Sequence, residues 1–333
     1  MQPPRPAPSS TPVDVLIVGA GPIGLACGIE AKRHGLTARI VEKGGLVNSL
    51  IGYPTNLEFF STPELLEIGG HPLPTANYKP HREETIDYYQ NVAQQEALDV
   101  RLYERVEHVE GRDGAFEIVT SKGTHHARKV VVATGFFDHP NSLGVPGEAL
   151  PKVTHYFKEP YPYAGQRVAV VGAKNSAAKV ALDCYRHGAE VTLLVRGPAI
   201  SDSVKYWIKP DLENRIKEGS IRAFFDTTVT AIEPDAVHLQ TPEGARVIGN
   251  DFVLAMTGYR PDFRFLGVLG VLLDGDRRIP QHDPDTMESN RAGLYLAGTV
   301  CGGLNTSRWF IENGRVHAAQ IMAHVAEATS MAD

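Results

Sequence analysis

The chain has 333 residues, of which 42% are hydrophobic and 22% are charged, and its formal net charge is −6. This length is enough for two domains with a full core each, and the composition is ordinary for a globular protein. The negative charge, without a long run of Lys or Arg, gives no support for a nucleic-acid partner or an anionic membrane surface.

The first twelve residues carry five prolines and little apolar content, which predicts a disordered tail over residues 1–12 rather than a targeting signal. The longest uncharged stretch, residues 15–29, has 15 residues and is interrupted by glycines and a proline, so it is too short to span a membrane. Because no signal peptide precedes it, we expect the protein to stay in the cytoplasm.

An apolar strand over residues 13–18 runs into a glycine-rich turn and then a helix. The turn reads Gly19-Ala20-Gly21-Pro22-Ile23-Gly24, which matches the pattern G-x-G-x-x-G of dinucleotide-binding sites. Glycines there allow a tight turn, a close approach of the backbone to a pyrophosphate, and packing of the helix on the strand. The helix N-terminus then offers free N–H groups and a positive dipole to the phosphates.

The next predicted strand, residues 38–41, ends in an acidic residue. Glu42 lies 23 positions after Gly19, where a carboxylate accepts the hydroxyls of an adenosine ribose and repels a 2′-phosphate. The first site is therefore predicted to take a dinucleotide whose ribose is not phosphorylated. The alternative interpretation is that Glu42 is a solvated strand end beside Lys43.

The segment between the two glycine-rich turns is expected to contain a loop, a helix and several strands. Its two adjacent histidines are expected to lie at a solvated strand end and not to bind a metal ion. The expected elements are a Gly- and Pro-rich loop over 44–79, a helix from about Arg82, strands over 100–109 and 115–120, the pair His125 and His126, and a buried strand over 128–133 followed by Thr134 and Gly135.

A second strand, turn and helix begin at residue 167. The turn Gly172-Ala173-Lys174-Asn175-Ser176-Ala177 has lysine where the second glycine is expected, and the following strand ends at Arg196, 24 positions after Gly172. A guanidinium at that place suits a 2′-phosphate, so the second site is predicted to take NADPH. Arg196 as an ordinary surface cation is the alternative, and Lys205 and Lys209 either add phosphate contacts or are surface residues.

The two halves repeat each other, because the strands that precede Gly135 and Gly258 are both apolar and both end in Thr-Gly. After the second half, an apolar strand over 293–298 and a helix over 306–328, with a break expected at Gly314, complete the first domain. The fold class is thus α/β with two Rossmann-like domains, the second inserted into the first. The predicted boundaries are 13–158 with 284–333 for the first domain and 159–283 for the second.

The three cysteines, Cys27, Cys184 and Cys301, are far apart in the sequence. No C-x-x-C and no cysteine–histidine cluster occurs, so neither a structural disulfide nor a metal site is predicted.

From Val13 to about Ala326 the chain resembles the flavoprotein disulfide reductases of the low-molecular-weight thioredoxin-reductase type, and within them the YpdA-type bacillithiol-disulfide reductases. The resemblance rests on the first turn with Glu42-Lys43, Tyr53-Pro54-Thr55, Phe59-Phe60-Ser61, residues 155–159, the second turn with its lysine, Tyr295-Leu296-Ala297-Gly298, and residues 310–314. It implies FAD in the first domain, NADPH in the second, a homo-oligomer and a role in redox homeostasis.

The resemblance also implies which residues bind the cofactors. For FAD they are Gly19, Gly21, Pro22, Ile23, Gly24, Glu42, Lys43, Val106, Ala133, Thr134, Gly135, Gly298 and Thr299; for NADPH they are Gly172, Lys174, Asn175, Ser176 and Arg196.

Two departures concern the thiol. Residues 156–166, where thioredoxin reductases carry C-x-x-C, hold no cysteine, and Ile23 stands where YpdA-type reductases place theirs. Cys27, one helical turn after Ile23, and Cys301, in a loop expected near the flavin, are candidates for the missing role, although a cysteine in an apolar helix is more often a core residue.

We therefore expect an NADPH-dependent FAD oxidoreductase that passes a hydride from NADPH to FAD and electrons on to a low-molecular-weight disulfide. The alternatives are a thiol-independent flavin reductase that serves a ferredoxin or a small acceptor, and a flavin monooxygenase. The region around His155 lacks F-x-G-x-x-x-H, which counts against a Baeyer–Villiger monooxygenase.

Overall fold

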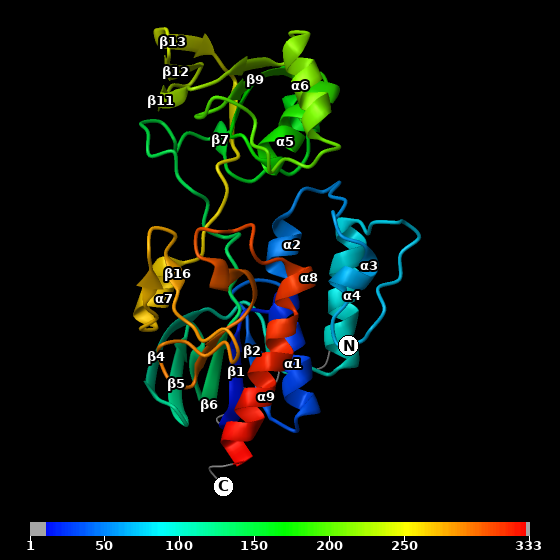
Figure 1. The fold of residues 1–333 in the computed structure, drawn as a ribbon, viewed down its shortest axis with the longest axis vertical. Coiled ribbons are helices and arrows are strands. Elements are labelled where there is room, and N and C mark those ends of the chain that lie inside the picture. Colours follow the sequence, from blue (N-terminus) through cyan, green and yellow to red (C-terminus); the bar gives the residue numbers. More distant parts are fainter. Residues whose placement is uncertain (1–10, 331–333) are drawn as a thin grey trace. The chain divides into compact units, whose positions relative to one another are not determined.

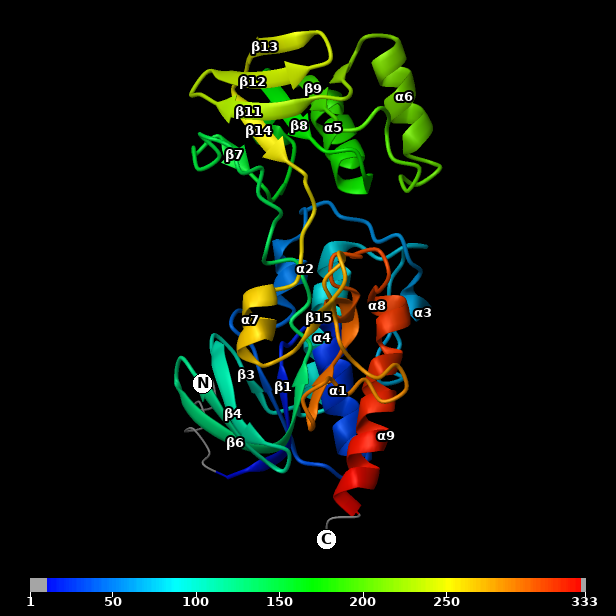
Figure 2. The same ribbon diagram turned by 60° about the vertical axis from the view of Figure 1, so that its left-hand side comes forward.

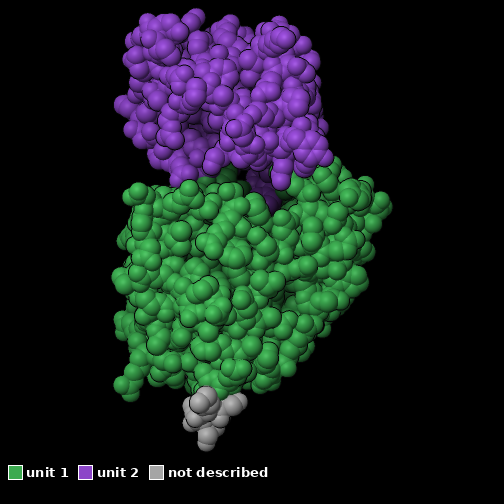
Figure 3. Space-filling view, in the orientation of Figure 1, with its two compact units in different colours: residues 1–51, 57–139, 259–333 green, residues 52–56, 140–258 purple. Residues whose placement is uncertain are grey.

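The computed structural model describes residues 11–330, so residues 1–10 of the predicted tail lie outside the described part of the chain. The chain forms two compact units, coloured separately in Figure 3. Of the described residues, unit 1 contains 11–51, 57–139 and 259–330, and unit 2 contains 52–56 and 140–258.

Unit 1 is built on one seven-stranded sheet in the order β3-β2-β1-β6-β5-β4, and β17 pairs with residues 130–132 of β6, beyond the stretch that pairs with β5 (Figure 1). The strands next to β1 are parallel, whereas β4, β5 and the first half of β6 form an antiparallel extension. The strands are β1 (Val13–Val18), β2 (Ala38–Val41), β3 (Val100–Arg101), β4 (Val106–Arg112), β5 (Ala115–Thr120), β6 (Gly123–Val132) and β17 (Leu294–Leu296), and a separate hairpin pairs β15 (Leu273–Asp274) with β16 (Ile279–Pro280).

Helices α1 and α9 lie side by side in unit 1 in both ribbon views (Figures 1 and 2). The predicted break in the last helix is present, because α8 ends at Gly314 and α9 begins at Val316. The helices of unit 1 are α1 (Pro22–Arg33), α3 (Pro63–Leu66), α4 (Arg82–Gln95), α7 (Phe263–Val268), α8 (Ile311–Gly314) and α9 (Val316–Ser330), with a 3-10 helix over Gly298–Gly302; α2 (Asn48–Gly52) ends at the first residue of unit 2.

Unit 2 combines a five-stranded parallel sheet, in the order β10-β9-β8-β14-β7, with a three-stranded antiparallel sheet β11-β12-β13 (Figure 2). Its elements are β7 (Val153–Thr154), a 3-10 helix over Tyr161–Tyr163, β8 (Arg167–Val171), α5 (Asn175–Arg186), β9 (Glu190–Leu194), α6 (Lys209–Lys217), β10 (Arg222–Phe224), β11 (Thr228–Ile232), β12 (Ala236–Thr241), β13 (Gly244–Gly249) and β14 (Phe252–Ala255).

The central strands are apolar on both faces, as is usual for parallel strands covered on both sides. Leu16 and Ile17 of β1 and Val130 of β6 are fully buried. In unit 2, Val170, Leu193 and Leu254 hold the same central place. Runs of β-branched and leucine side chains therefore determine which strands occupy the middle of each sheet.

The insertion of one domain into the other is confirmed. β17 pairs with β6 through Leu294 and Val130, so the C-terminal strand belongs to the first sheet. Residues 140–158 belong to unit 2, since β7 pairs with β14. Residues 259–283 belong to unit 1, where the Arg291 guanidinium donates to the carbonyls of Val109 (3.1 Å) and Leu269 (2.9 Å). The two units thus divide at 139/140 and 258/259, whereas the sequence-based boundaries were 158/159 and 283/284.

One expectation about the histidine pair is wrong. His125 is buried at 4% exposure instead of solvated, and its Nε2 lies 2.6 Å from Glu104 Oε1. Its Nδ1 lies 3.2 Å from a guanidinium nitrogen of Arg39, which only donates, so Nδ1 accepts and Nε2–H donates to Glu104. The alternation of β6 turns His125 inward and leaves His126 exposed.

Among residues 11–330, no helix is both long and apolar enough to cross a membrane.

Gly24 tests how closely α1 packs on the first turn. A Cβ on Gly24 would overlap the carbonyl oxygen of Gly19, whereas a Cβ on Gly21 meets nothing within 4 Å. We therefore expect Gly24→Ala to lower the free energy of unfolding by about 2 kcal/mol or more, measured by urea denaturation. Gly21→Ala is the matched control and should change it by less than about 1 kcal/mol; equal effects of the two variants would contradict this packing.

Candidate functional site

The two glycine-rich turns have the same backbone geometry. Gly19 has φ +111° and a Cβ on it would lie 2.6 Å from the carbonyl oxygen of Ala133. Gly172 has φ +143° and a Cβ on it would lie 2.6 Å from the carbonyl oxygen of Met256. At both positions the turn passes close to the residue that follows a neighbouring strand of the same sheet, β6 in unit 1 and β14 in unit 2, so only glycine fits. The sequence repeat is thus a repeat of structure as well.

The helices that follow these turns begin without a side-chain cap. Gly21, which precedes α1, has no side chain, and Lys174, which precedes α5, has no acceptor atom on its side chain, and neither helix has an acidic residue in its first turn. By contrast, Asp262 caps α7 by accepting from the Phe265 N–H at 3.0 Å. Open N–H groups and a helix dipole at both turns fit the phosphates of a dinucleotide. The open space beside Gly21 allows such a group to approach the backbone.

Glu42 is hydrogen-bonded to the backbone of the first turn and to that of its own loop. Its Oε2 accepts from the Ala20 N–H at 2.9 Å and its Oε1 accepts from the Gly44 N–H at 2.8 Å. The side chain is 8% exposed, so it is not a freely solvated strand end. A carboxylate has about four acceptor positions, and these two bonds leave lone pairs for hydroxyl groups. Lys43 is ion-paired with Asp138 at 2.8 Å.

Several predicted residues from distant parts of the sequence meet at one end of the unit 1 sheet. A Cβ on Gly298 would lie 2.9 Å from Ile23 Cγ1, and a Cβ on Gly314 would lie 3.4 Å from the Gly298 Cα. Gly135 approaches the Thr299 hydroxyl, with 3.5 Å between that oxygen and a Cβ built on Gly135. Ile23 therefore fills a tight site between two glycines, where an isoleucine side chain is held and a thiol is absent.

The structure adds His317, a residue that the sequence analysis missed. The Gly298 N–H donates to His317 Nδ1 at 3.0 Å, so this nitrogen carries no proton and the ring is neutral. The side chain is 1% exposed, and burial lowers the pKa of His317 from 6.5 to about 4, with smaller contributions from the charges of His282 and Arg308. A helix residue that holds a turn 19 positions earlier leaves no spacing signal in the sequence.

In unit 2, Asn175 holds the loop that follows Arg196. Its Oδ1 accepts from the Lys205 N–H at 2.9 Å and its Nδ2 donates to the Ser203 carbonyl at 3.0 Å. Arg196, Lys174 and Ser176 are exposed. Lys209 pairs with Asp202 at 2.7 Å, so its charge is balanced within the loop. The exposed cations Lys174 and Arg196, together with the uncapped N-terminus of α5, therefore make the surface at this turn positively charged.

All three cysteines are buried at 0% exposure. Burial raises the pKa of the Cys27 and Cys184 thiols to about 12, and it raises the pKa of Cys301 as well. A thiol with a pKa near 12 has only about one thiolate in 10⁵ molecules at pH 7. Within residues 11–330, no group of His, Cys, Asp and Glu side chains is arranged to hold a metal ion.

A family model described as pyridine nucleotide-disulphide oxidoreductase matches residues 16–298. The chain belongs to this family. It is similar to the bacilliredoxin reductase Bdr of Bacillus subtilis (strain 168), with 43% identity over 94% of this chain and 97% of that protein.

Two solved structures are also similar over nearly the whole chain. The bacillithiol disulfide reductase Bdr (YpdA) from Bacillus cereus has 40% identity and a TM-score of 0.93, over 96% of this chain and 100% of that one. The enzyme of the same name from Staphylococcus aureus has 37% identity and a TM-score of 0.92, over 96% and 99%. The resemblance seen in the sequence is confirmed: the chain is a thioredoxin-reductase-like oxidoreductase that uses FAD and NADPH.

The neutral state of His317 predicts how stability depends on pH. Because the folded-state pKa lies below the unfolded value, the unfolded chain takes up a proton first, and stability is lost as the pH falls from about 6.5 to about 4. The full shift corresponds to at most about 3 kcal/mol. His317→Asn keeps an acceptor for Gly298 but does not titrate, so its unfolding free energy should fall less steeply over this range in urea denaturation.

The exposed His34 provides the matched control. His34→Asn should give a curve parallel to that of the wild type. If His317→Asn also runs parallel to it, the assigned tautomer and pKa of His317 are wrong.

Proposed function

We propose that this chain reduces a low-molecular-weight disulfide of the bacillithiol type at the expense of NADPH. The balance is NADPH + H⁺ + RSSR → NADP⁺ + 2 RSH, in which the nicotinamide is oxidised and the S–S bond is reduced and broken. The observation that carries the proposal is the pair of equivalent glycine turns, the first bound by the buried Glu42 and the second accompanied by the exposed Arg196, which follows β9. The similarity to Bdr over nearly the whole chain supports the substrate class.

The first turn would hold FAD. Gly19 and Gly24 set the turn, Gly21 gives room for the pyrophosphate, and the open end of α1 donates to it. Glu42 would accept the ribose hydroxyls. The remaining residues assigned to FAD are Pro22, Ile23, Lys43, Val106, Ala133, Thr134, Gly135, Gly298 and Thr299, and the buried His317 would hold the turn at Gly298 in place.

The second turn would hold NADPH. Gly172 allows the crossing with Met256, and Lys174 and Ser176 stand exposed at the start of α5. Asn175 would stabilise the site by holding the loop at Ser203 and Lys205, to which it is hydrogen-bonded, and not only by contacting the nucleotide. The Arg196 guanidinium would pair with the 2′-phosphate.

Bound FAD supplies the chemistry of accepting a hydride and passing on two electrons. The chain itself contributes orientation and exclusion of water, and we propose that it contributes no thiol. Ile23 occupies the position of the family's cysteine, and Cys27, Cys184 and Cys301 are all buried with raised pKa values. A homo-oligomeric state stays a prediction from the resemblance, and a cytoplasmic location stays a prediction from the sequence.

Stopped-flow absorbance on the purified yellow protein tests the proposal. NADPH should bleach the flavin rapidly, and bacillithiol disulfide should restore the oxidised spectrum over repeated turnovers. Glutathione disulfide and a ferredoxin serve as comparison acceptors. Turnover with ferredoxin but not with the disulfide would favour the electron-transfer alternative, and a protein that stays colourless after FAD is supplied would exclude both.

The burial of the cysteines predicts that the native protein is inert to thiol reagents. Labelling with N-ethylmaleimide at pH 7, read by mass spectrometry, should modify no cysteine in the NADPH-reduced native protein, and all three after unfolding in guanidinium. Cys27→Ser and Cys301→Ser should keep bacillithiol disulfide turnover within about twofold wherever the flavin is retained. A mixed disulfide with bacillithiol on either cysteine, found by mass spectrometry, would instead show that a thiol takes part.

The charge at the end of β9 predicts the choice of nicotinamide cofactor. Arg196→Glu should raise KM for NADPH by about tenfold to a hundredfold, because a charge-assisted bond is replaced by repulsion. KM for NADH should change little. The exposed Lys217 on α6 provides the control, since Lys217→Glu makes the same change of charge in the same unit. Equal effects of Arg196→Glu on both cofactors would defeat the assignment.

A further inference from the structure

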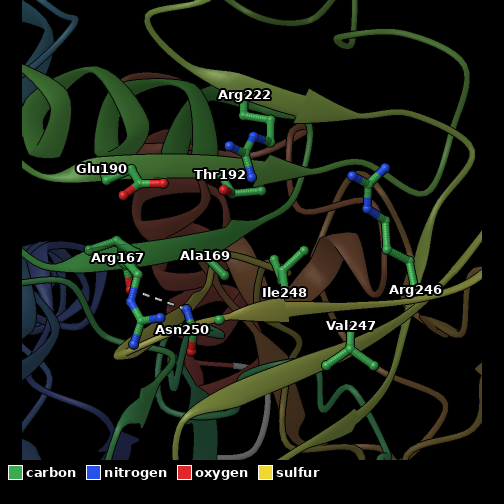
Figure 4. A pocket seen from close by; sticks show the side chains of 11 residues that line it. Arg167, Ala169, Glu190, Thr192, Arg222, Arg246, Val247, Ile248 and Asn250 are labelled. Carbon is green, nitrogen blue, oxygen red and sulfur yellow. Dashed lines mark hydrogen bonds between the residues drawn. The ribbon is translucent and has the colours of Figure 1, made fainter.

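A pocket in unit 2 lies between the parallel sheet and the antiparallel sheet (Figure 4). Its volume is about 250 Å³. It is lined by Arg167, Val168, Ala169, Glu190, Thr192, Arg222, Arg246, Val247, Ile248, Gly249 and Asn250. None of these residues belongs to the predicted nucleotide sites.

Small side chains create the space. Ala169, Thr192 and Arg222 stand in register across β8, β9 and β10, so they form one row on one face of the sheet. Deeper along the same two sheets, Leu194 and Leu239 are among the buried residues of the core. The side chains of Ala169 and Thr192 are small, so less of the space between their row and β13 is filled, and the pocket lies there.

The walls of the pocket carry unbalanced positive charge. Among residues 11–330, no ion pair joins Arg222 or Arg246 to a carboxylate, whereas the other arginines of unit 2 at positions 167, 186 and 215 are paired in this way. In Figure 4 the Arg222 guanidinium lies beside Thr192, while Arg246 extends from the facing strand. The Arg246 guanidinium lies over the Phe224 ring at 4.9 Å, a contact that holds the side chain without neutralising it.

The other charged groups at the pocket do not cancel this charge. Arg167 is engaged by Asp251, with contacts of 3.0 Å and 2.6 Å, so that pair is neutral. Glu190 is the one acidic residue among the lining residues. Its single negative charge is smaller than the combined positive charge of the Arg222 and Arg246 guanidinium groups, so the pocket is net positive.

We propose that this pocket binds a small oxyanion, a carboxylate or a phosphate, through Arg222, Arg246 and the Thr192 hydroxyl. Planar guanidinium groups bind both kinds of oxyanion in a bidentate manner. The wall of Ala169 and Ile248 covers an apolar part of the same molecule.

The pocket is separate from the NADPH turn because of its place on the sheet. Arg167, Glu190 and Arg222 are the first residues of β8, β9 and β10. Nucleotides bind at the opposite, carboxyl end of such strands, where Gly172 lies. An anion in this pocket would thus bind together with NADPH rather than in its place.

Isothermal titration calorimetry on the flavin-loaded full chain, saturated with NADP⁺ to occupy the nucleotide site, tests the proposal. Inorganic phosphate and citrate are titrated separately. We expect at least one of them to bind at one site, and the one that binds identifies the oxyanion as phosphate or carboxylate. Arg222→Gln and Arg246→Gln should each weaken that binding by about tenfold or more.

The control is Arg264→Gln on α7 of unit 1, which removes an exposed arginine elsewhere and should leave the affinity unchanged. Hydrogen exchange gives a second measurement, because the bound anion should protect backbone amides of β9 and β13 in the wild type and not in Arg222→Gln. The proposal is overturned if neither anion binds the wild type below about 10 mM, or if Arg222→Gln and Arg246→Gln bind as the wild type does.

Discussion

The crossing of each glycine turn over a neighbouring carbonyl is the constraint on which the rest of the molecule depends. Gly19 passes the carbonyl oxygen of Ala133 and Gly172 passes that of Met256, in each case with no room for a Cβ. This approach places the helix N-terminus directly beyond the strand ends, where its N–H groups are open. The two proposed cofactor sites both lie at that crossing.

The same arrangement of strand, turn and helix occurs in both units, but the residue that follows the second strand is acidic in unit 1 and basic in unit 2. In unit 1 the second strand leads to Glu42, which accepts hydrogen bonds from two backbone N–H groups of the turn region and is buried there. In unit 2 the corresponding strand leads to Arg196, which is exposed. The proposed choice between the two nucleotides therefore rests on a single position after a strand, while the frame of the turn is shared.

The end of the unit 1 sheet also bears on the chemistry after flavin reduction. Ile23 is packed between Gly298 and Gly314, and the neutral His317 holds Gly298 from α9. This packing is apolar and tight, and the nearby cysteines are as buried as core residues. This fold of the pyridine nucleotide-disulphide oxidoreductase family thus presents no exposed thiol among its three cysteines, which is the basis of the proposal that the flavin acts without one.

The sequence by itself determined the two turns, the strands that carry them, the charges at Glu42 and Arg196 and the return of the last strand to the first sheet. These features are local or periodic, since glycine needs, strand alternation and strand-end charges are set within a few residues. Only the tertiary structure decided that His125 is buried, that His317 binds Gly298, that residues 140–158 join unit 2 through β7, and that three arginines from three strands line one pocket. These depend on contacts between residues far apart in the chain, and their pairing is fixed by how the sheets and helices pack rather than by any spacing in the sequence.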